Sequence, residues 1–217
     1  MIDLHVHTSL VTGKQTPAAA MRFAKAAGYR AIAFTDHVDA TTMRHVLESL
    51  LPMVKTYSLY SGIDLYAGVE LTHVPPQLLP DTIAEARDMG AHIVTVHGET
   101  IADIVDEGTN LAAIEGGADY LAHPGLLSEQ EAELAAEKNV LLEITAHPDH
   151  ALTNGHVAKA AASAGAKLIL NNGGSRGYDF INKDRRRAIA LGAGMSKEQY
   201  QETEHNSRML ISRMMML

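Results

Sequence analysis

The chain has 217 residues, 46% of them hydrophobic, and its 26 acidic and 18 basic residues give a formal net charge of −8. This length predicts one domain over residues 1–217, and the negative charge argues against nucleic acid as a partner. No apolar run reaches the roughly 20 residues needed to span a bilayer, and Asp3 and His5 interrupt the N-terminus too early for a signal peptide. We therefore expect a cytoplasmic protein without a membrane partner. The absence of cysteine leaves nitrogen and oxygen as the ligands for any metal.

Short apolar runs alternate with Ala-rich helical segments along the chain, which is typical of parallel β/α architecture. The predicted strands are Ile2–His5, Ala31–Thr35, Leu65–Leu71, His92–Val96, Tyr120–Ala122, Val140–Ile144 and Lys167–Leu170. The predicted helices run from Thr16-Pro17 to Gly28, over Thr42–Tyr60 with an interruption at Pro52, over Asp81–Met89, Ala102–Glu107, Leu111–Glu115 and His156–Ala164, and onward from the caps Ser128 and Ser196. This order predicts an α/β barrel of seven strands with a helix between almost every pair.

Imidazole and carboxylate groups recur where the predicted strands end. In an extended strand His5 and His7 point to the same face, so both rings can reach one metal ion. The carboxyl ends of barrel strands converge on the face where active sites are built. The residues at such ends are His5, His7, His37, Glu70, His97 and His123. They predict a metal site with nitrogen and oxygen ligands, which suits zinc, iron or manganese without choosing among them.

Five ordered motifs also carry a family resemblance. The segments D-L-H-x-H-T from Asp3, T-D-H from Thr35, G-V-E from Gly68, V-H-G-E from Val96 and L-A-H-P-G from Leu121 resemble the polymerase-and-histidinol-phosphatase (PHP) domain over the whole chain. The resemblance implies a distorted seven-stranded (β/α)7 TIM-like barrel whose two- or three-metal site hydrolyses phosphate esters. It implies ligand roles for His5, His7, Glu70, His97 and His123, with His37 as a further candidate.

Three positions depart from the pattern of that family, because Thr12, Gly173 and Ser175 stand where it has metal ligands. We therefore expect two divalent ions (zinc, manganese or iron), bridged by Glu70, and an empty third position. His37 would then be free to act as the general acid.

Two basic residues near the altered positions are candidates for binding phosphate, namely Lys14 and Arg176. Consecutive glycines before Arg176 would let backbone N–H groups turn toward an anion. The alternative is a loop whose arginine is only solvated.

The leading functional prediction is a metal-dependent hydrolase of a small phosphomonoester, similar to histidinol-phosphate phosphatase. One alternative is a degenerate PHP domain that binds metal or phosphate without turnover, and another is a phosphodiesterase on the same metals. A metal-dependent amidohydrolase or deaminase also begins with His-x-His on a barrel strand. Against it, no lysine ends the fourth strand and Glu70 is left without a role.

Several other residues receive weaker interpretations. Glu143 and His147, after the sixth strand, are either contacts of the site or ordinary loop residues. His73 is interpreted as structural, His92 as lying at the opposite end of the barrel, and Arg185–Arg187 as a solvated helix face. No role is assigned to His45, His150, His156 or His205, and the Met-rich end, Met209–Leu217, predicts a packing or homo-oligomer contact.

Overall fold

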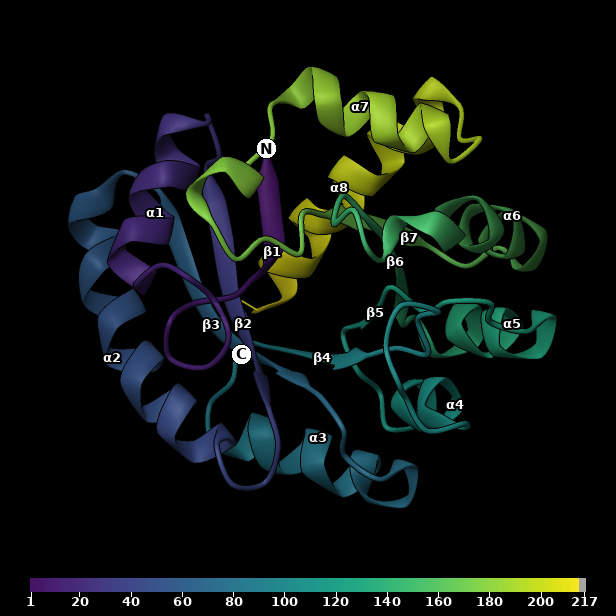
Figure 1. The fold of residues 1–217 in the computed structure, drawn as a ribbon, viewed down its shortest axis with the longest axis horizontal. Coiled ribbons are helices and arrows are strands. Elements are labelled where there is room, and N and C mark those ends of the chain that lie inside the picture. The colour runs from purple at the N-terminus through teal and green to yellow at the C-terminus, as the bar shows by residue number, and fades with distance from the viewer. Residues whose placement is uncertain (215–217) are drawn as a thin grey trace.

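Seven parallel strands form a single sheet in the computed structural model, which describes residues 1–214 (Figure 1). The strands follow the order of the sequence: β1 (Ile2–Val6), β2 (Ala31–Val38), β3 (Asp64–Leu71), β4 (Ile93–His97), β5 (Tyr120–Ala122), β6 (Leu141–Thr145) and β7 (Leu168–Asn171). The two outer strands approach each other, since Leu4 N donates to Asn171 Oδ1 at 3.0 Å and His7 N donates to Gly174 O at 2.9 Å. The sheet is therefore a nearly closed, TIM-like (β/α)7 barrel, and the predicted fold class is confirmed.

Helices surround the strands (Figure 1). They are α1 (Pro17–Ala26), α2 (Met43–Ser61), α3 (Leu79–Asp88), α4 (Thr109–Glu115), α5 (Glu129–Lys138), α6 (Asn154–Ala164), α7 (Lys183–Gly192) and α8 (Lys197–Met214), with short 3₁₀ turns at Pro76–Leu78, Ala151–Thr153 and Gly177–Asp179. The predicted caps are present: Thr16 accepts from Ala19 N, and Ser128 and Glu131 form a capping box. None of these helices combines the length and the apolar character that crossing a bilayer requires.

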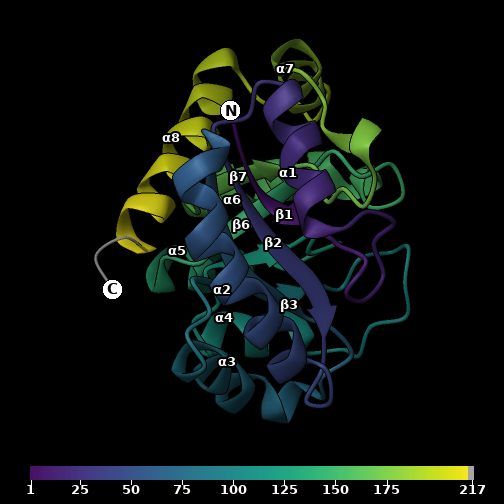
Figure 2. The same cartoon turned by 90° about the vertical axis from the view of Figure 1, so that its left-hand side faces the viewer.

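Two helix predictions need correction. α2 continues through Pro52, which lies on its exposed side, where water can solvate the carbonyl that the proline leaves without a donor. Figure 2 shows α2 lying along β2 and β3, and the buried face that it presents there holds the helix together. Residues 102–107 form an irregular loop instead of a helix. Ile104 in that loop is 92% exposed, so the segment has no apolar face to bury against the barrel.

The inside of the barrel is filled at the amino-terminal ends of the strands. Small and aliphatic side chains from the strands meet Leu210, Ile211 and Met214 of α8 in one buried cluster. The predicted packing role of the Met-rich end is confirmed for these residues, residues 215–217 lie outside the described part, and a homo-oligomer contact stays a prediction. This filling leaves the opposite, carboxyl ends of the strands as the place for a polar site.

The solvated-face interpretation is wrong for the middle arginine of α7. Arg186 is fully buried, while Arg185 and Arg187 are exposed as predicted. Its guanidinium donates to Leu170 O at 2.6 Å and lies 3.1 Å from the Glu204 carboxylate. The side chain therefore joins α7, α8 and β7, which only the packing of α7 against the barrel could reveal.

Candidate metal centre

Glu70, near the carboxyl end of β3, lies at the centre of a group of histidines and is completely buried. Its Oε2 atom is 2.9 Å from His5 Nε2, 3.5 Å from His7 Nε2 and 3.2 Å from His37 Nδ1. His37 and Glu70 are direct neighbours in the β2–β3 register, so their side chains leave the sheet on the same face. One carboxylate oxygen thus faces three imidazoles: His5 on β1, His7 directly after β1, and His37 on β2.

The second carboxylate oxygen of Glu70 faces two further imidazoles. Its Oε1 atom is 3.0 Å from His97 Nδ1 and 3.4 Å from His123 Nε2. His97 ends β4 and His123 follows β5, where the backbone turns sharply: His123 itself has a φ of 29° and Gly125 one of 67°. The structure therefore brings together all six residues predicted at the strand ends.

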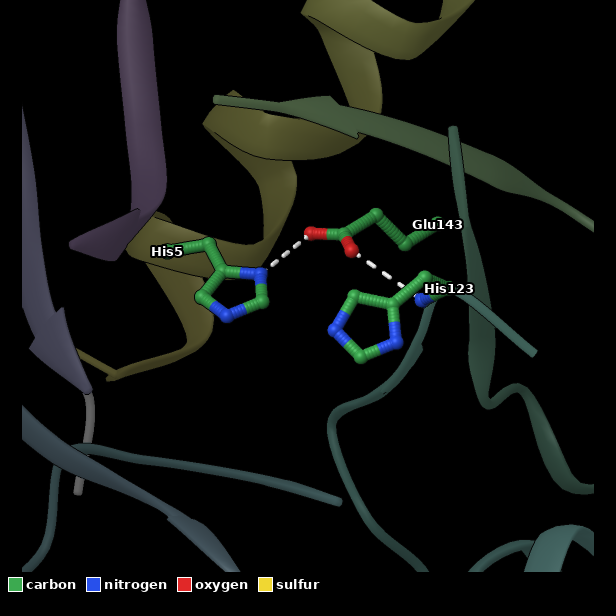
Figure 3. Close-up of side chains that lie close together, drawn as sticks. All are labelled: His5, His123 and Glu143. Carbon is green, nitrogen blue, oxygen red and sulfur yellow. Dashed lines mark hydrogen bonds and ion pairs between the residues drawn. The ribbon is translucent and has the colours of Figure 1, made fainter. Parts of the chain in front are cut away.

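Glu143 of β6 joins the same cluster from the inside of the barrel (Figure 3). Its carboxylate accepts from His5 Nδ1 at 2.8 Å, from His123 N at 3.1 Å and from Asn171 Nδ2 at 2.9 Å. Of the two open interpretations, contact of the site or ordinary loop residue, the structure selects the first. A carboxylate on Nδ1 fixes the His5 ring so that Nε2 points toward Glu70, an arrangement that metal-binding histidines commonly have.

Burial and neighbouring charges shift the pKa values of the cluster in different directions. Burial favours the neutral form of His5, but the carboxylates of Glu143 and Glu70 outweigh it and raise the pKa of His5 well above its ordinary value. Burial likewise opposes the charge of Glu70, yet the surrounding imidazoles hold its pKa well below the usual range. For His7 and His123, burial dominates and lowers the pKa. These two rings are therefore neutral near pH 7, which is the form that offers a lone pair to a metal.

The donor atoms fit divalent metal ions. Three groups have ligand atoms within 4.8 Å of one another: His5–His7–Glu70, His37–Glu70–His97 and His5–His123–Glu143. Four buried ring nitrogens in the described residues also have no hydrogen-bond partner, on His7, His97, His123 and His147. Imidazole and carboxylate ligands suit zinc, iron and manganese. The structure thus contains buried histidine–glutamate groups of the kind that bind metals, while the number and identity of the ions stay predictions.

A cavity of about 190 Å³ opens over these groups. It is lined by His5, His7, Thr12, His37, His123, His147, His150, Gly173 and Ser175. His150, to which the sequence assigned no role, stacks on His123 with ring centroids 4.1 Å apart and bonds Thr100 Oγ1 through Nδ1 at 2.9 Å. The only signal in the sequence was its place in the loop after the sixth strand.

The two predicted phosphate-binding residues do not line this cavity. Arg176 is exposed, its guanidinium bonds the Tyr178 hydroxyl, and it lies over that ring at 5.6 Å from the centroid. Lys14 is also exposed, and its backbone N donates to Ser175 O at 2.9 Å. The geometry therefore favours the alternative of a solvated arginine. The altered positions Thr12, Gly173 and Ser175, in contrast, do face the histidines.

The fold and the cluster define a TIM-like barrel with a buried histidine–glutamate centre at the carboxyl ends of its strands. The chain belongs to the family of unknown function DUF6282, which matches residues 1–176. An uncharacterized protein of Methanocaldococcus jannaschii is 36% identical over 203 residues, 93% of each chain. The predicted membership in the PHP family is therefore wrong. The motifs that suggested it are short segments around ligands at strand ends, and three ligand positions of that family are occupied by Thr12, Gly173 and Ser175.

Several solved structures share the fold. A chain of the cryo-EM structure of archaeal ribonuclease P with mature tRNA has a TM-score of 0.75 at 15% identity, covering 99% of this chain and 91% of that chain. A putative prolidase from Bifidobacterium longum has a TM-score of 0.64 at 12% identity, with 98% and 69% covered. Histidinol phosphate phosphatase from Lactococcus lactis subsp. lactis, complexed with zinc, L-histidinol and phosphate, has a TM-score of 0.56 at 15% identity, with 98% and 93% covered. At these identities the similarity shows the fold.

Proposed function

We propose that the protein is a metal-dependent hydrolase that cleaves a small phosphate ester. The observation that carries the proposal is Glu70, whose two carboxylate oxygens each face a separate set of imidazoles while the residue is completely buried. A carboxylate that bridges two divalent ions needs this arrangement. The shared fold of a zinc-containing phosphatase and of a prolidase supports hydrolysis as the reaction class.

We assign the ligands in two sets that share Glu70. His5 and His7 would hold one ion, and His97 and His123 the other, while the place near Thr12 and Ser175 would hold none. Two divalent ions in such a site supply an activated water and stabilise the negative charge that develops on the transferred group. Zinc, manganese or iron suits these ligands.

The side chains of this protein have their own roles in the reaction. Glu143 keeps the His5 ring oriented, and Asn171 in turn holds Glu143. Nδ1 of His37 donates toward the Thr72 hydroxyl at 2.8 Å and Glu70 at 3.2 Å, so Nε2 can give a proton to the leaving oxygen only from the imidazolium form. Burial lowers the pKa of His37, and a negatively charged phosphoryl group in the cavity that His37 lines would favour that charged form. His37 is therefore proposed as the general acid.

The lining of the cavity favours a phosphate ester over a peptide. Its residues contribute imidazoles, the hydroxyl groups of Thr12 and Ser175, and a glycine, and none of the described residues that line it is a carboxylate. Such a lining offers hydrogen-bond donors to an anionic group and no like charge that would repel it. A volume of about 190 Å³ suits a compact group such as phosphate.

Hydrolysis of an amide is the second candidate, because one carboxylate does lie beside the cluster. Asp103 Oδ2 is 3.3 Å from His97 Nε2 and 3.8 Å from His150 Nε2, and its side chain is half exposed. From there it can carry a proton from the attacking water to a departing amine. The prolidase-like fold neighbours are consistent with this alternative.

The test combines metal analysis with a substrate panel. Purified protein should contain two divalent ions per chain by elemental analysis and hydrolyse phosphomonoesters faster than phosphodiesters, dipeptides or N-acyl amino acids. Glu70→Gln should lose metal and activity together, whereas His205→Ala, which removes an exposed histidine on α8, should change neither. Full metal content in Glu70→Gln would contradict the bridging role, and cleavage of dipeptides alone would select the amide alternative.

A further inference from the structure

A second cavity, of about 240 Å³, lies on the other side of His97. The aliphatic side chains of its lining are Leu71, Val74, Leu79, Val96, Ile104 and Val105. Leu71, Val74, Leu79 and Val96 are buried and belong to the core around β3 and β4. Its polar residues are His73, Asp106 and Thr109, beside His97 itself. This lining differs in kind from that of the first cavity, which consists of imidazoles, hydroxyl groups and glycine.

His97 lies between the two cavities. Its ring lines the second cavity and lies 4.5 Å from the ring of His123 and 5.4 Å from the ring of His37, both of which line the first. The carboxylate of Asp103, the residue before Ile104, lies 3.3 Å from His97 Nε2. A molecule whose reacting group sits beside His97 therefore has an apolar space next to that group.

Two further features mark the second cavity as a binding site. Ile104 exposes 92% of its surface at the edge of the cavity, although it stands next to a space that would cover an apolar group. His73 has a φ of 57°, a left-handed backbone conformation that costs free energy for a residue other than glycine. Its ring centroid is 6.4 Å from that of His97. Strained backbone is concentrated at functional sites, and an apolar side chain exposed at the edge of a cavity is free to contact a ligand bound there.

We infer that this second cavity binds an uncharged alkyl or aryl group of the substrate, next to the bond that is cleaved. The inference rests on the proposed function, because it places the reacting group at the cluster around Glu70. Six of the ten residues that line the cavity are aliphatic, so burying an alkyl or aryl group against them removes apolar surface from water. The carboxylate of Asp106 disfavours an anionic group there. The substrate is accordingly a phosphate ester of an apolar alcohol, with Ile104 and His73 determining its specificity.

Direct binding of an apolar fragment tests the cavity without any catalysis. Protein labelled with ¹³C at its methyl groups is titrated with benzyl alcohol, and the methyl signals of Ile104, Val74 and Val105 should shift. The methyl signals of Leu152, which is 78% exposed on the loop after β6 and does not line this cavity, serve as the control and should not shift. Shifts at Ile104 no larger than those at Leu152 would overturn the inference.

Kinetics on a series of esters test the same cavity during turnover. From methyl to butyl phosphate, kcat/KM should rise roughly fourfold for each added methylene group that becomes buried. Benzyl phosphate should be preferred over methyl phosphate, and Ile104→Asp should lower that preference roughly tenfold while Leu152→Asp leaves it unchanged. Equal effects of the two substitutions, or a flat series, would refute the subsite while the proposed function stands. If no ester is hydrolysed, the proposed function fails, and the methyl shifts still decide whether the cavity binds an apolar group.

Discussion

Replacing Glu143 by glutamine tests how the centre is held together. The carboxylate accepts three hydrogen bonds: Oε1 from His5 Nδ1 and Asn171 Nδ2, and Oε2 from the His123 backbone N. A glutamine of the same shape has only one acceptor oxygen. If its NH₂ group replaces Oε2, the His123 N–H loses its acceptor; if it replaces Oε1, two donors lose theirs. The first orientation is therefore favoured.

The expected cost follows from that single lost acceptor. Leaving one buried donor unsatisfied costs about 1–3 kcal/mol, and Glu143 is completely buried, so solvent cannot compensate. The His5 imidazolium also loses one of the two carboxylates that stabilise it in the metal-free protein. In the metal-bound protein, loss of the group that orients a ligand should lower metal affinity by about 10–100-fold.

Two measurements on Glu143→Gln separate these effects. Urea unfolding in the presence of a chelator gives the free energy of unfolding, which should fall by about 1–3 kcal/mol. Competition with a chromophoric chelator gives the metal affinity. Glu133→Gln, on the exposed side of α5, is the matched control and should change neither quantity. An unchanged metal affinity in Glu143→Gln would refute the orienting role of this carboxylate.

Three further substitutions test other parts of the structure. Arg186→Met leaves the Leu170 carbonyl without its donor and leaves Glu204, which is 17% exposed, without its partner. Urea unfolding should therefore show a loss of about 1–3 kcal/mol, and an unchanged free energy of unfolding would contradict this account. Burial lowers the pKa of His92, whose Nδ1 accepts from Ala67 N, so the unfolded chain binds a proton at this residue more tightly than the folded protein does. As the pH falls below about 6.5, the wild-type protein should therefore lose stability relative to His92→Asn. Parallel stability–pH curves for the two proteins would exclude this linkage. Gly125→Ala adds a Cβ atom 1.8 Å from the backbone oxygen of Glu99, at a residue whose φ is 67°. The backbone strain alone should lower the stability by about 1–3 kcal/mol. A melting temperature equal to that of the wild type would show that the turn relaxes freely.

The strand pattern could be predicted because its causes are local. Each strand is a short, mostly apolar run with a polar residue at its end or directly after it, and residues such as Thr16 and Ser128 cap the helices that follow. Sequential parallel strands with helical connections pack in one hand and in order, so the ends that carry His5 and Glu70 had to meet at one face. Because His-x-His on a strand directs both rings to that face, the gathering of these residues could be predicted as well, while their role as metal ligands stays a prediction.

Predictions that depended on segments outside regular elements were less successful. The segment 102–107 has a helix-compatible composition, but Ile104 stays 92% exposed, so the segment has too little apolar surface buried to stabilise a helix there. The direction of the Arg176 side chain depends on Tyr178, two residues away in a turn, and not on the anion that the neighbouring glycines suggested. Neither outcome follows from periodicity.

By itself the sequence determined the seven-stranded barrel, the face that carries the candidate site, and six residues that gather there, because these follow from the period of the strands and from where each strand ends. Only the tertiary structure decided the rest. Glu143 contacts His5 from 138 positions away, Arg186 is buried by the packing of α7 against β7, and His150 reaches His123 through the fold of a loop. Each of these contacts joins segments that are brought together only when the barrel closes, and no local pattern of residues encodes which side chain will fill the space between them.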